Sequence, residues 1–178
     1  SVVNHPVAAV LSRRSFPVDI RHNAKIDRTA VLVGLMTCSL ALESPFPAGV
    51  NVRILVTGAS SLIGDGVVRA LAARGDEVVC LQRSPVNGLA ALDGVEQQLG
   101  DIRDQAAVER AAQGCNGIIH LAAKVGVVGE RDEFLSINVE GTRNLLQAAT
   151  KSAENSVANL AITRFVHVSS PSVAHGGE

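Results

Sequence analysis

The sequence predicts an α/β fold in which helices cover both faces of a doubly wound parallel sheet. Three observations predict it. Short apolar runs recur between residues 52 and 169, stretches with helical spacing separate them, and the first run ends in a glycine-rich turn. Strands that alternate with helices are typical of βαβ units. Right-handed crossovers bring the carboxyl ends of such strands to one edge of the sheet.

The first predicted strand is Val52–Thr57, an apolar run suited to a strand buried on both faces. A helix is expected next, because apolar residues recur at helical spacing from Ile63 to Leu71. Arg74-Gly75 supplies the stop for this helix. Glu77–Leu81 is the second predicted strand.

The third and fourth predicted strands are Glu96–Leu99 and Gly117–Leu121. Between them, Asp104 is expected to cap a helix that Gly114 closes. A longer helix is expected from about Asp132, with these residues on one face: Phe134, Ile137, Gly141, Leu145 and Ala148.

The fifth predicted strand is Arg164–Ser169, and the sequence ends soon after it. We therefore expect a sheet truncated after strand five. His120 and His167 lie within the apolar runs of the last two strands. Both are expected to be core histidines with satisfied ring nitrogens.

Residues 1–50 are expected to form an irregular N-terminal extension and linker, and residues 51–178 the sheet domain. The first fifty residues hold four of the six prolines and no extended period-2 or period-3.6 pattern. Glu43–Gly49 indicates a linker, because prolines restrict the residues before them and remove backbone donors.

Composition excludes several classes of partner. The chain has 178 residues, 47% hydrophobic and 19% charged, with a formal net charge of -1. This is enough for one soluble domain with an appended segment. The near-neutral charge gives no reason to expect nucleic acid or an anionic membrane as a partner. The longest apolar stretch, Val31–Leu42, is too short to cross a bilayer, so we expect no transmembrane span.

The cysteine count carries two expectations. Three cysteines cannot all pair and lack the spacing of a metal site, so we expect a reduced, cytoplasmic protein without a bound metal. Cys80 and Cys115 are expected to be small buried side chains.

A nucleotide phosphate site is expected where the first strand meets its helix. Thr57–Gly64 (TGASSLIG) would place backbone N–H groups and the positive end of a helix dipole against a pyrophosphate. Glycine is needed there because a Cβ would block the approach. The expected contacts are Gly58, Ser60, Ser61, Leu62, Ile63 and Gly64.

This loop resembles the opening motif T-G-x-x-G-x-x-G of the extended short-chain dehydrogenase/reductase family. Thr57, Gly58 and Gly64 match it, whereas Ser61 stands in place of the middle glycine. The Cβ of Ser61 would narrow the approach of the pyrophosphate, or its hydroxyl would donate to a phosphate oxygen. The resemblance implies a Rossmann-like NAD(P)-binding domain over residues 51–178, without the family's C-terminal substrate region.

Two further segments resemble cofactor-binding parts of the family. Gly100–Asp104 is similar to the adenine-contacting loop after strand three, with Asp101 and Ile102 as the expected contacts. His120–Ala123 is similar to the turn after strand four, where small residues let the cofactor pass the backbone. The contacts expected in that turn are Leu121, Ala122 and Ala123.

Two more segments resemble catalytic parts of the family. Asn138–Thr142 is similar to its helix-four motif, with Asn138 facing inward. Val168–Val173 is similar to the segment that carries the active-site serine, here Ser170. The resemblance implies that Ser170 hydrogen-bonds the substrate oxygen beside a tyrosine and a lysine that follow strand five. The chain contains no tyrosine, so we expect the 178 residues alone to be inactive.

Residues 120–126 (HLAAKVG) and 167–177 (HVSSPSVAHGG) most resemble the 3β-hydroxysteroid dehydrogenase-like branch. Within it, they are similar to bacterial reductases of 2-alkyl-3-oxoalkanoates. This implies reduction of a ketone to an alcohol on a hydrophobic β-keto fatty-acyl or steroid-like small molecule. The family's usual state, a homodimer, is left open by the sequence.

The residues at the end of the second predicted strand indicate which dinucleotide cofactor is preferred. About 20 residues after the phosphate loop, an NAD site usually has an acid for the ribose 2′-OH. Here Gln82 stands in that place and Arg83 follows it. A guanidinium binds a 2′-phosphate well, and the missing carboxylate removes a repulsion. We therefore predict NADP, with NAD as second choice; the alternative is that Arg83 is a solvated surface residue.

Phe16–Arg28 resembles the closing motif of acyl-adenylate-forming ligases, P-x-x-x-x-G-K-[IV]-x-R. Lys25 matches the motif lysine, and Ala24 replaces the glycine. The resemblance implies the tail of a ligase domain over residues 1–30, without ligase activity. Two alternatives to a reductase stay open: a nucleotide-sugar epimerase or dehydratase of the same superfamily, and a non-catalytic nucleotide-binding module.

Overall fold

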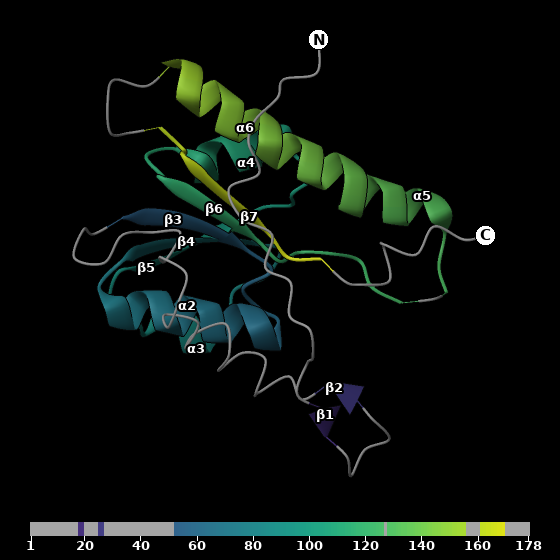
Figure 1. Cartoon of the computed structure of the whole chain (residues 1–178), viewed down its shortest axis with the longest axis horizontal. Coiled ribbons are helices and arrows are strands. Elements are labelled where there is room, and N and C mark those ends of the chain that lie inside the picture. The colour runs from purple at the N-terminus through teal and green to yellow at the C-terminus, as the bar shows by residue number, and fades with distance from the viewer. Residues whose placement is uncertain (1–17, 20–24, 27–51, 127, 156–160, 170–178) are drawn as a thin grey trace. The chain divides into compact units, whose positions relative to one another are not determined.

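A computed structural model shows one five-stranded parallel sheet with helices on both faces (Figure 1). The structure describes residues 18–19, 25–26, 52–126, 128–155 and 161–169. The strand order is β5-β4-β3-β6-β7, which is the doubly wound order of a Rossmann-like sheet. The predicted fold class is therefore confirmed. The strands are β3 Arg53–Thr57, β4 Glu77–Gln82, β5 Val95–Leu99, β6 Gly117–His120 and β7 Arg164–His167.

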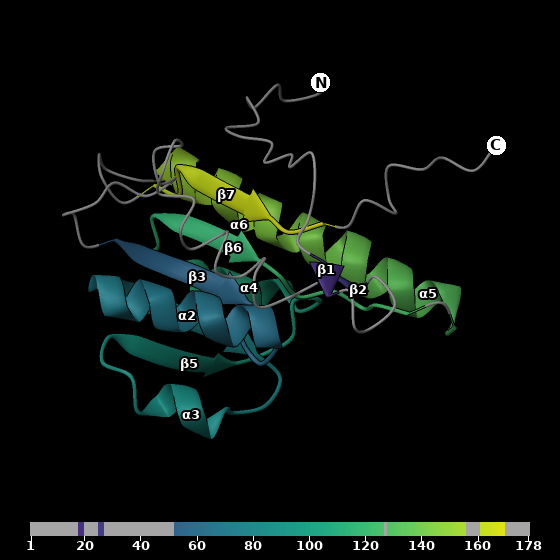
Figure 2. The same cartoon turned by 60° about the horizontal axis from the view of Figure 1, so that its bottom comes forward.

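The sheet divides the core into two layers. On β3, Ile54 and Val56 face one layer and Leu55 faces the other, because successive strand side chains point to opposite faces. The first layer is covered by α2 (Leu62–Arg74) and α3 (Asn87–Ala90), and the second by α4 (Gln105–Ala112) and α6 (Gly141–Asn155) (Figures 1 and 2). This packing holds the strand ends rigidly where loops leave the sheet.

The predicted helix ends are confirmed by their hydrogen bonds. Asp104 accepts from the backbone N–H groups of Ala106 (2.9 Å) and Ala107 (3.3 Å) at the start of α4. Gly75 ends α2 in the left-handed conformation, with φ 88°, which glycine adopts without a Cβ penalty. These signals are local, so the sequence alone was enough to place them.

The last long helix departs from the expected single element. It runs as α5 (Arg131–Phe134), a π-helical turn η3 (Leu135–Glu140) and α6. A π-helical turn is uncommon and is frequently found at functional sites, and here it contains Asn138. The short helix α3 was not predicted, because four residues with no side-chain cap carry no periodic signal.

His167 was predicted to be a core histidine, and this is wrong. It lies at the exposed end of β7. In the described part of the chain β7 pairs with one strand only, β6, so its end is covered from one side. His120, on β6, is 1% exposed and is a core histidine as predicted. Cys80 and Cys115 are buried free thiols, also as predicted.

The chain divides into two compact units, Ser1–Leu42 and Glu43–Glu178. In the first, β1 (Val18–Asp19) and β2 (Lys25–Ile26) form a short antiparallel pair. Lys25 of the ligase-like segment lies on β2; most of that segment, and the predicted linker, lie outside the described residues. The division expected near residue 50 stays a prediction.

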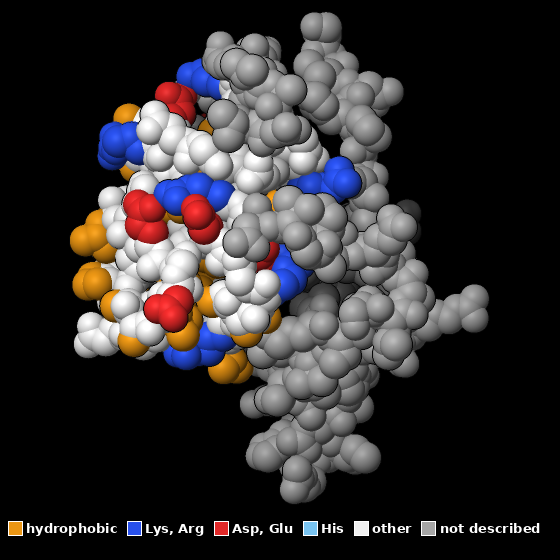
Figure 3. Space-filling model, turned by 90° about the vertical axis from the view of Figure 1, so that its left-hand side faces the viewer, with side chains coloured by type: hydrophobic (Ala, Val, Ile, Leu, Met, Phe, Trp, Pro, Cys, Tyr) orange, Lys and Arg blue, Asp and Glu red, His pale blue; other side chains and the backbone are white. Residues whose placement is uncertain are grey.

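The charged surface mixes both signs. At the amino ends of the strands, Arg53 pairs with Glu77 (3.0 Å) and with Glu96 (2.6 Å). Figure 3 shows acidic and basic side chains next to one another on the described part of one face. Within the described ranges, no helix is long and apolar enough to span a membrane, and no cluster of His, Cys, Asp or Glu has the make-up of a metal site.

Candidate cofactor-binding site

Four loops leave the sheet at its carboxyl edge and lie at one level. The parallel register pairs Thr57 with Leu81 on β4 and with His120 on β6, and pairs Gln82 with Leu99 on β5. The loops after these four strands therefore begin side by side. In doubly wound sheets this edge is where ligands bind. The predicted cofactor residues after β3, β4, β5 and β6 all lie along it.

The loop after β3 presents a helix start to this edge. Ser61 is the N-cap of α2, with φ −78° and ψ 160°, and its Oγ accepts from the N–H of Gly64 at 3.0 Å. This backbone conformation suits any L residue, so replacement of the motif glycine by serine causes no strain. The hydroxyl hydrogen is not used by that bond and remains able to donate. Ser60 and Leu62 are exposed beside it, and Ile63 is half-buried.

Gly58 and Gly64 allow close contacts between backbone segments at the phosphate loop, as the motif requires. Gly58 has φ 74°, and a Cβ on it would lie 2.7 Å from the N atom of Ala122. A Cβ on Gly64 would overlap the carbonyl oxygen of Gly58 and lie 2.8 Å from the Cα of Ala59. The resulting cradle of glycines at the start of a helix fits a pyrophosphate.

A chain of hydrogen bonds joins the end of β3, where the phosphate loop begins, to α6. Thr57 Oγ1 lies 2.7 Å from Nδ1 of His120, and His120 Nε2 lies 2.9 Å from Oγ1 of Thr142. Thr142 already donates its hydroxyl hydrogen to the carbonyl of Asn138 at 2.7 Å. Since a hydroxyl has one hydrogen, Nε2 must be the donor to Thr142, and Nδ1 must accept from Thr57.

The backbone after β6 completes the chain. The N–H of Ala122 donates to Thr57 Oγ1 at 3.3 Å. Burial, with a smaller effect of the nearby His167, lowers the pKa of His120 to about 4, so the ring is neutral as this bonding requires. The phosphate loop, the turn at Leu121–Ala123 and the π-helical turn are thereby held together.

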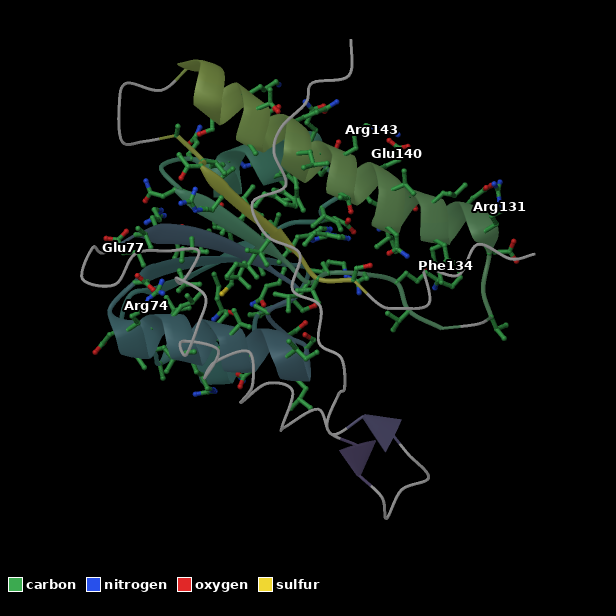
Figure 4. All side chains as sticks on the ribbon, viewed as in Figure 1. Arg74, Glu77, Arg131, Phe134, Glu140 and Arg143 are labelled. Atoms are coloured by element: carbon green, nitrogen blue, oxygen red, sulfur yellow. The ribbon has the colours of Figure 1, made fainter. Side chains whose placement is uncertain are left out.

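The side chain of Asn138 holds the loop after β6 by hydrogen bonds to the backbone of Lys124. Its Oδ1 accepts from the N–H of Lys124 at 2.7 Å, and its Nδ2 donates to the carbonyl of Lys124 at 2.9 Å. The Lys124 ammonium pairs with Glu133 at 2.7 Å, and this hydrogen bond is the main reason that the pKa of Glu133 lies below its usual value. The ammonium also lies 5.2 Å from the ring of Phe134, which projects from α5 toward this loop (Figure 4).

The loop after β5 is held by an ion pair. Arg103 donates to Asp101 from Nε (3.0 Å) and from Nη2 (2.7 Å). These bonds are the main cause of a lowered pKa for Asp101, which is therefore an ionised acceptor. Each carboxylate oxygen has more than one acceptor position, so the contact predicted with an adenine amine stays a prediction.

Ile102 contributes packing rather than an exposed side chain. It is 7% exposed, and a Cβ on Gly141 would lie 2.5 Å from its Cδ1. Its carbonyl accepts from Nδ2 of Asn144 at 2.9 Å. The side chain therefore fixes α6 against the loop, and the contact predicted between Ile102 and a nucleotide stays a prediction.

At the end of β4 a buried amide stands beside an exposed guanidinium. Gln82 is 6% exposed and donates from Nε2 to Oε1 of Gln97. Arg83 is exposed, and its charge contributes to the lowered pKa values of Asp101 and Glu133. The contact predicted between this guanidinium and the 2′-phosphate of an adenosine ribose stays a prediction.

Sequence reasoning missed several residues of this edge. Gln97 and Thr142 hold site residues in place through partners on other elements, and Arg103 does so through Asp101 in its own loop. Of these, Thr142 had a signal, because it closes the motif that contains Asn138. Ser170, the predicted catalytic serine, lies outside the described residues.

Comparison with known proteins agrees with this geometry. The model of the NAD dependent epimerase/dehydratase family matches residues 54–177. The chain belongs to this family. The match covers the sheet from β3 onward and the loops at its carboxyl edge, so the predicted resemblance to extended short-chain dehydrogenases/reductases is confirmed.

Curated members of the family show similar sequences over the same region. "Sterol demethylase protein B" of Methylococcus capsulatus is 40% identical over 65% of this chain and 34% of its own length. "2-alkyl-3-oxoalkanoate reductase" of Shewanella oneidensis is 37% identical over 69% of this chain and 30% of its own length. "3-beta-hydroxysteroid dehydrogenase" of Mycolicibacterium neoaurum is 35% identical over 71% and 34%. The chain thus spans about a third of each relative.

Solved structures of family members share the fold. A short-chain dehydrogenase/reductase superfamily protein from Agrobacterium tumefaciens, solved with bound NAD, superposes with a TM-score of 0.55. It is 36% identical, and the alignment covers 66% of this chain and 32% of that one. The family's dinucleotide-binding architecture is therefore present in this chain.

Proposed function

We propose that the chain is the cofactor-binding part of an NADP(H)-dependent oxidoreductase. Its reaction is reduction of a ketone to an alcohol on a β-keto fatty-acyl or steroid-like substrate. The observation that carries this is the glycine cradle of Gly58 and Gly64 at the start of α2, in a chain whose relatives include enzymes named for 3-oxoalkanoate and 3β-hydroxysteroid chemistry. A bound reduced nicotinamide would supply the hydride.

Different residues of the chain would bind the cofactor, position the loop beside it and contact the substrate. The loop from Gly58 to Gly64 would bind the pyrophosphate, and Leu121–Ala123 would let the cofactor pass beside β6. Asn138 acts as a positioning residue, since its amide fixes the backbone of Lys124 next to that turn. Ser170 would donate a hydrogen bond to the substrate oxygen. Proton transfer would need the tyrosine and lysine that follow strand five in the family.

Cofactor oxidation assays test the reaction. The protein that carries this chain together with the tyrosine and lysine region is expected to oxidise NADPH with a 3-oxoalkanoate or a 3-ketosteroid. The 178 residues alone are expected to bind nucleotide without turnover. Turnover of a UDP-sugar in place of both ketones would contradict the proposal.

A nucleotide-sugar epimerase or dehydratase is the second candidate, favoured by the description of the family model. Conversion of UDP-sugars would identify it. Nucleotide binding without turnover, in the presence of the tyrosine and lysine, would identify a non-catalytic module.

We also propose that the protein is cytoplasmic and forms a homodimer. The buried free thiols of Cys80 and Cys115 are compatible with a reducing compartment.

The preference for NADP is expected to depend on Arg83. Replacing Arg83→Ser should weaken binding of NADPH by about tenfold, since a charge-assisted hydrogen bond to phosphate contributes about 1.5 kcal/mol or more. Binding of NADH should change little, because a ribose hydroxyl does not need the charge. Titration of reduced-nicotinamide fluorescence gives both dissociation constants.

Arg110→Ser is the matched control for Arg83→Ser. Arg110 is an exposed arginine in the last turn of α4, away from the carboxyl edge. Its replacement should leave both dissociation constants as they are. Equal weakening of NADPH and NADH in the Arg83 variant would show that Arg83 does not select the cofactor.

A further inference from the structure

A pair of amides, the buried Gln82 and the half-buried Gln97, lies at the end of β4, where the adenosine ribose would bind. Gln97 on β5 faces Gln82 on β4 and also the backbone of Val86 in the loop that follows. Its Oε1 accepts from the N–H of Val86 at 2.8 Å, and its Nε2 donates to the carbonyl of Val86 at 3.1 Å. The same Oε1 accepts from Nε2 of Gln82. Gln97 thus holds both a loop and a neighbouring side chain.

The backbone of Val86 decides how both amides are turned. If Gln97 were reversed, its NH₂ would face the N–H of Val86 and its oxygen would face the carbonyl, so both bonds would be lost. Gln97 therefore presents its oxygen to Gln82. Gln82 must therefore donate from its NH₂ to the oxygen of Gln97. The oxygen of Gln82 then points away from Gln97.

The oxygen of Gln82 has no hydrogen-bond partner within the described ranges. Its Oε1 is buried, and the residue is 6% exposed. An unpaired buried acceptor is costly, so it favours any group that brings a donor to it. A ribose hydroxyl can donate, whereas the oxygens of a 2′-phosphate only accept at neutral pH apart from a residual proton.

We propose that Gln97 is a positioning residue that sets the cofactor preference by fixing Gln82 with its acceptor free. This inference rests on the proposed binding of NADP(H) at the same edge. Arg83 attracts the 2′-phosphate, and the fixed oxygen of Gln82 opposes it by favouring a hydroxyl. The chain therefore accepts NAD(H) as well, and its preference for NADP(H) is smaller than Arg83 alone would give.

Gln97→Met tests this inference in the 178-residue chain. Methionine keeps the length of the side chain and removes the acceptor, so the Gln82 amide is free to turn and present its NH₂ to a phosphate. The ratio of NADH to NADPH dissociation constants, from fluorescence titration, should rise by about fivefold to tenfold. Gln82→Leu removes the opposing oxygen altogether and should move the ratio in the same direction, even if Gln97→Met does not fold.

Two control variants separate the inference from a general change in the sheet. Gln97→Glu keeps an acceptor for Gln82 and for the N–H of Val86, so the ratio should not rise. Gln98→Met alters the next residue of β5, whose amide donates to Glu96 at 2.7 Å, and should leave the ratio unchanged. An unchanged ratio in Gln82→Leu, or an equal rise in Gln97→Glu, overturns the inference. Failure of the unaltered chain to bind either nucleotide overturns the proposed function and, with it, the inference.

Discussion

Replacing Gly64→Ala is expected to weaken nucleotide binding strongly. A Cβ at this position would overlap the carbonyl oxygen of Gly58 and press on the Cα of Ala59. Both are backbone atoms of the phosphate loop, so a change of rotamer cannot relieve the contact. The loop or the first turn of α2 must shift, which costs about 1–3 kcal/mol in a packed site.

The same shift removes the bond that starts the helix. Gly64 donates its N–H to Oγ of Ser61 at 3.0 Å, and moving either residue exposes the helix end that would hold the pyrophosphate. An N-cap bond contributes about 1 kcal/mol. Together these effects, about 2–4 kcal/mol, should weaken binding of NADPH and NADH alike by about 30-fold to 700-fold, since 1.4 kcal/mol corresponds to about tenfold. Fluorescence titration measures the loss, and urea unfolding measures the stability.

Gly66→Ala adds the same methyl group two residues later in the same helix. Gly66 lies inside α2 and is half-buried, and alanine favours a helix interior over glycine by about 1 kcal/mol. This variant should bind both nucleotides as the unaltered chain does and should unfold at a higher urea concentration. If Gly64→Ala bound nucleotide normally, the close contact of α2 with the loop would not be a requirement of the site.

Local patterns predicted most of the fold. The sequence identified the five strands of the sheet to within two residues. Apolar runs marked four of them, because strands buried in a parallel sheet read as hydrophobic stretches, whereas Glu96–Leu99 (EQQL) was identified by its place before Gly100-Asp101. The caps at Asp104 and Gly75 were found from residue type and spacing. The π-helical turn was not predicted, because the spacing of Phe134, Ile137 and Gly141 indicated a regular helix.

The site divides in the same way. The glycines of the phosphate loop were found because a close contact between backbone segments requires glycine, a residue type that the sequence shows directly. The role of Gln97 left no such signal, since it depends on Gln82, a partner 15 residues away that the sheet brings close. Thr142 was visible only as the last residue of the motif that contains Asn138, and its bond to His120, 22 residues away, was not predicted. His167 was misplaced for a related reason, because an apolar run does not show that its strand has, in the described part of the chain, a neighbour on one side only.

Replacing His120→Leu is expected to destabilise the fold strongly. Leucine fills a similar volume but takes the acceptor from Thr57 and the donor from Thr142. Thr57 is fully buried, and a buried hydroxyl left without its partner costs about 1–3 kcal/mol. Thr142 is half-buried and recovers part of its bond from water. The free energy of unfolding, measured in urea at pH 7, should fall by about 2–4 kcal/mol. Nucleotide binding should weaken as the Ala122 turn loosens.

Low pH should reduce the difference between this variant and the unaltered chain. The pKa of His120 is about 4 in the folded chain, and a histidine in an unfolded chain titrates near 6.5. Between these values the unfolded state binds the extra proton, so stability is present above about pH 6.5 and is lost as the pH falls toward 4, by up to about 3 kcal/mol. The leucine variant has no such proton to bind, and its stability should change less over the same range.

His167→Leu is the matched control for this pH dependence. His167 pairs with His120 in the strand register and its ring centroid lies 5.1 Å away, but its side chain is exposed. Because it takes no part in the bonds to Thr57 and Thr142, its replacement should cost little stability and should leave the loss between pH 6.5 and pH 4 in place. A loss of that pH dependence in His167→Leu, with His120→Leu still showing it, would assign the titration to the exposed ring and would remove the buried His120 as the group that ties the phosphate loop to the π-helical turn.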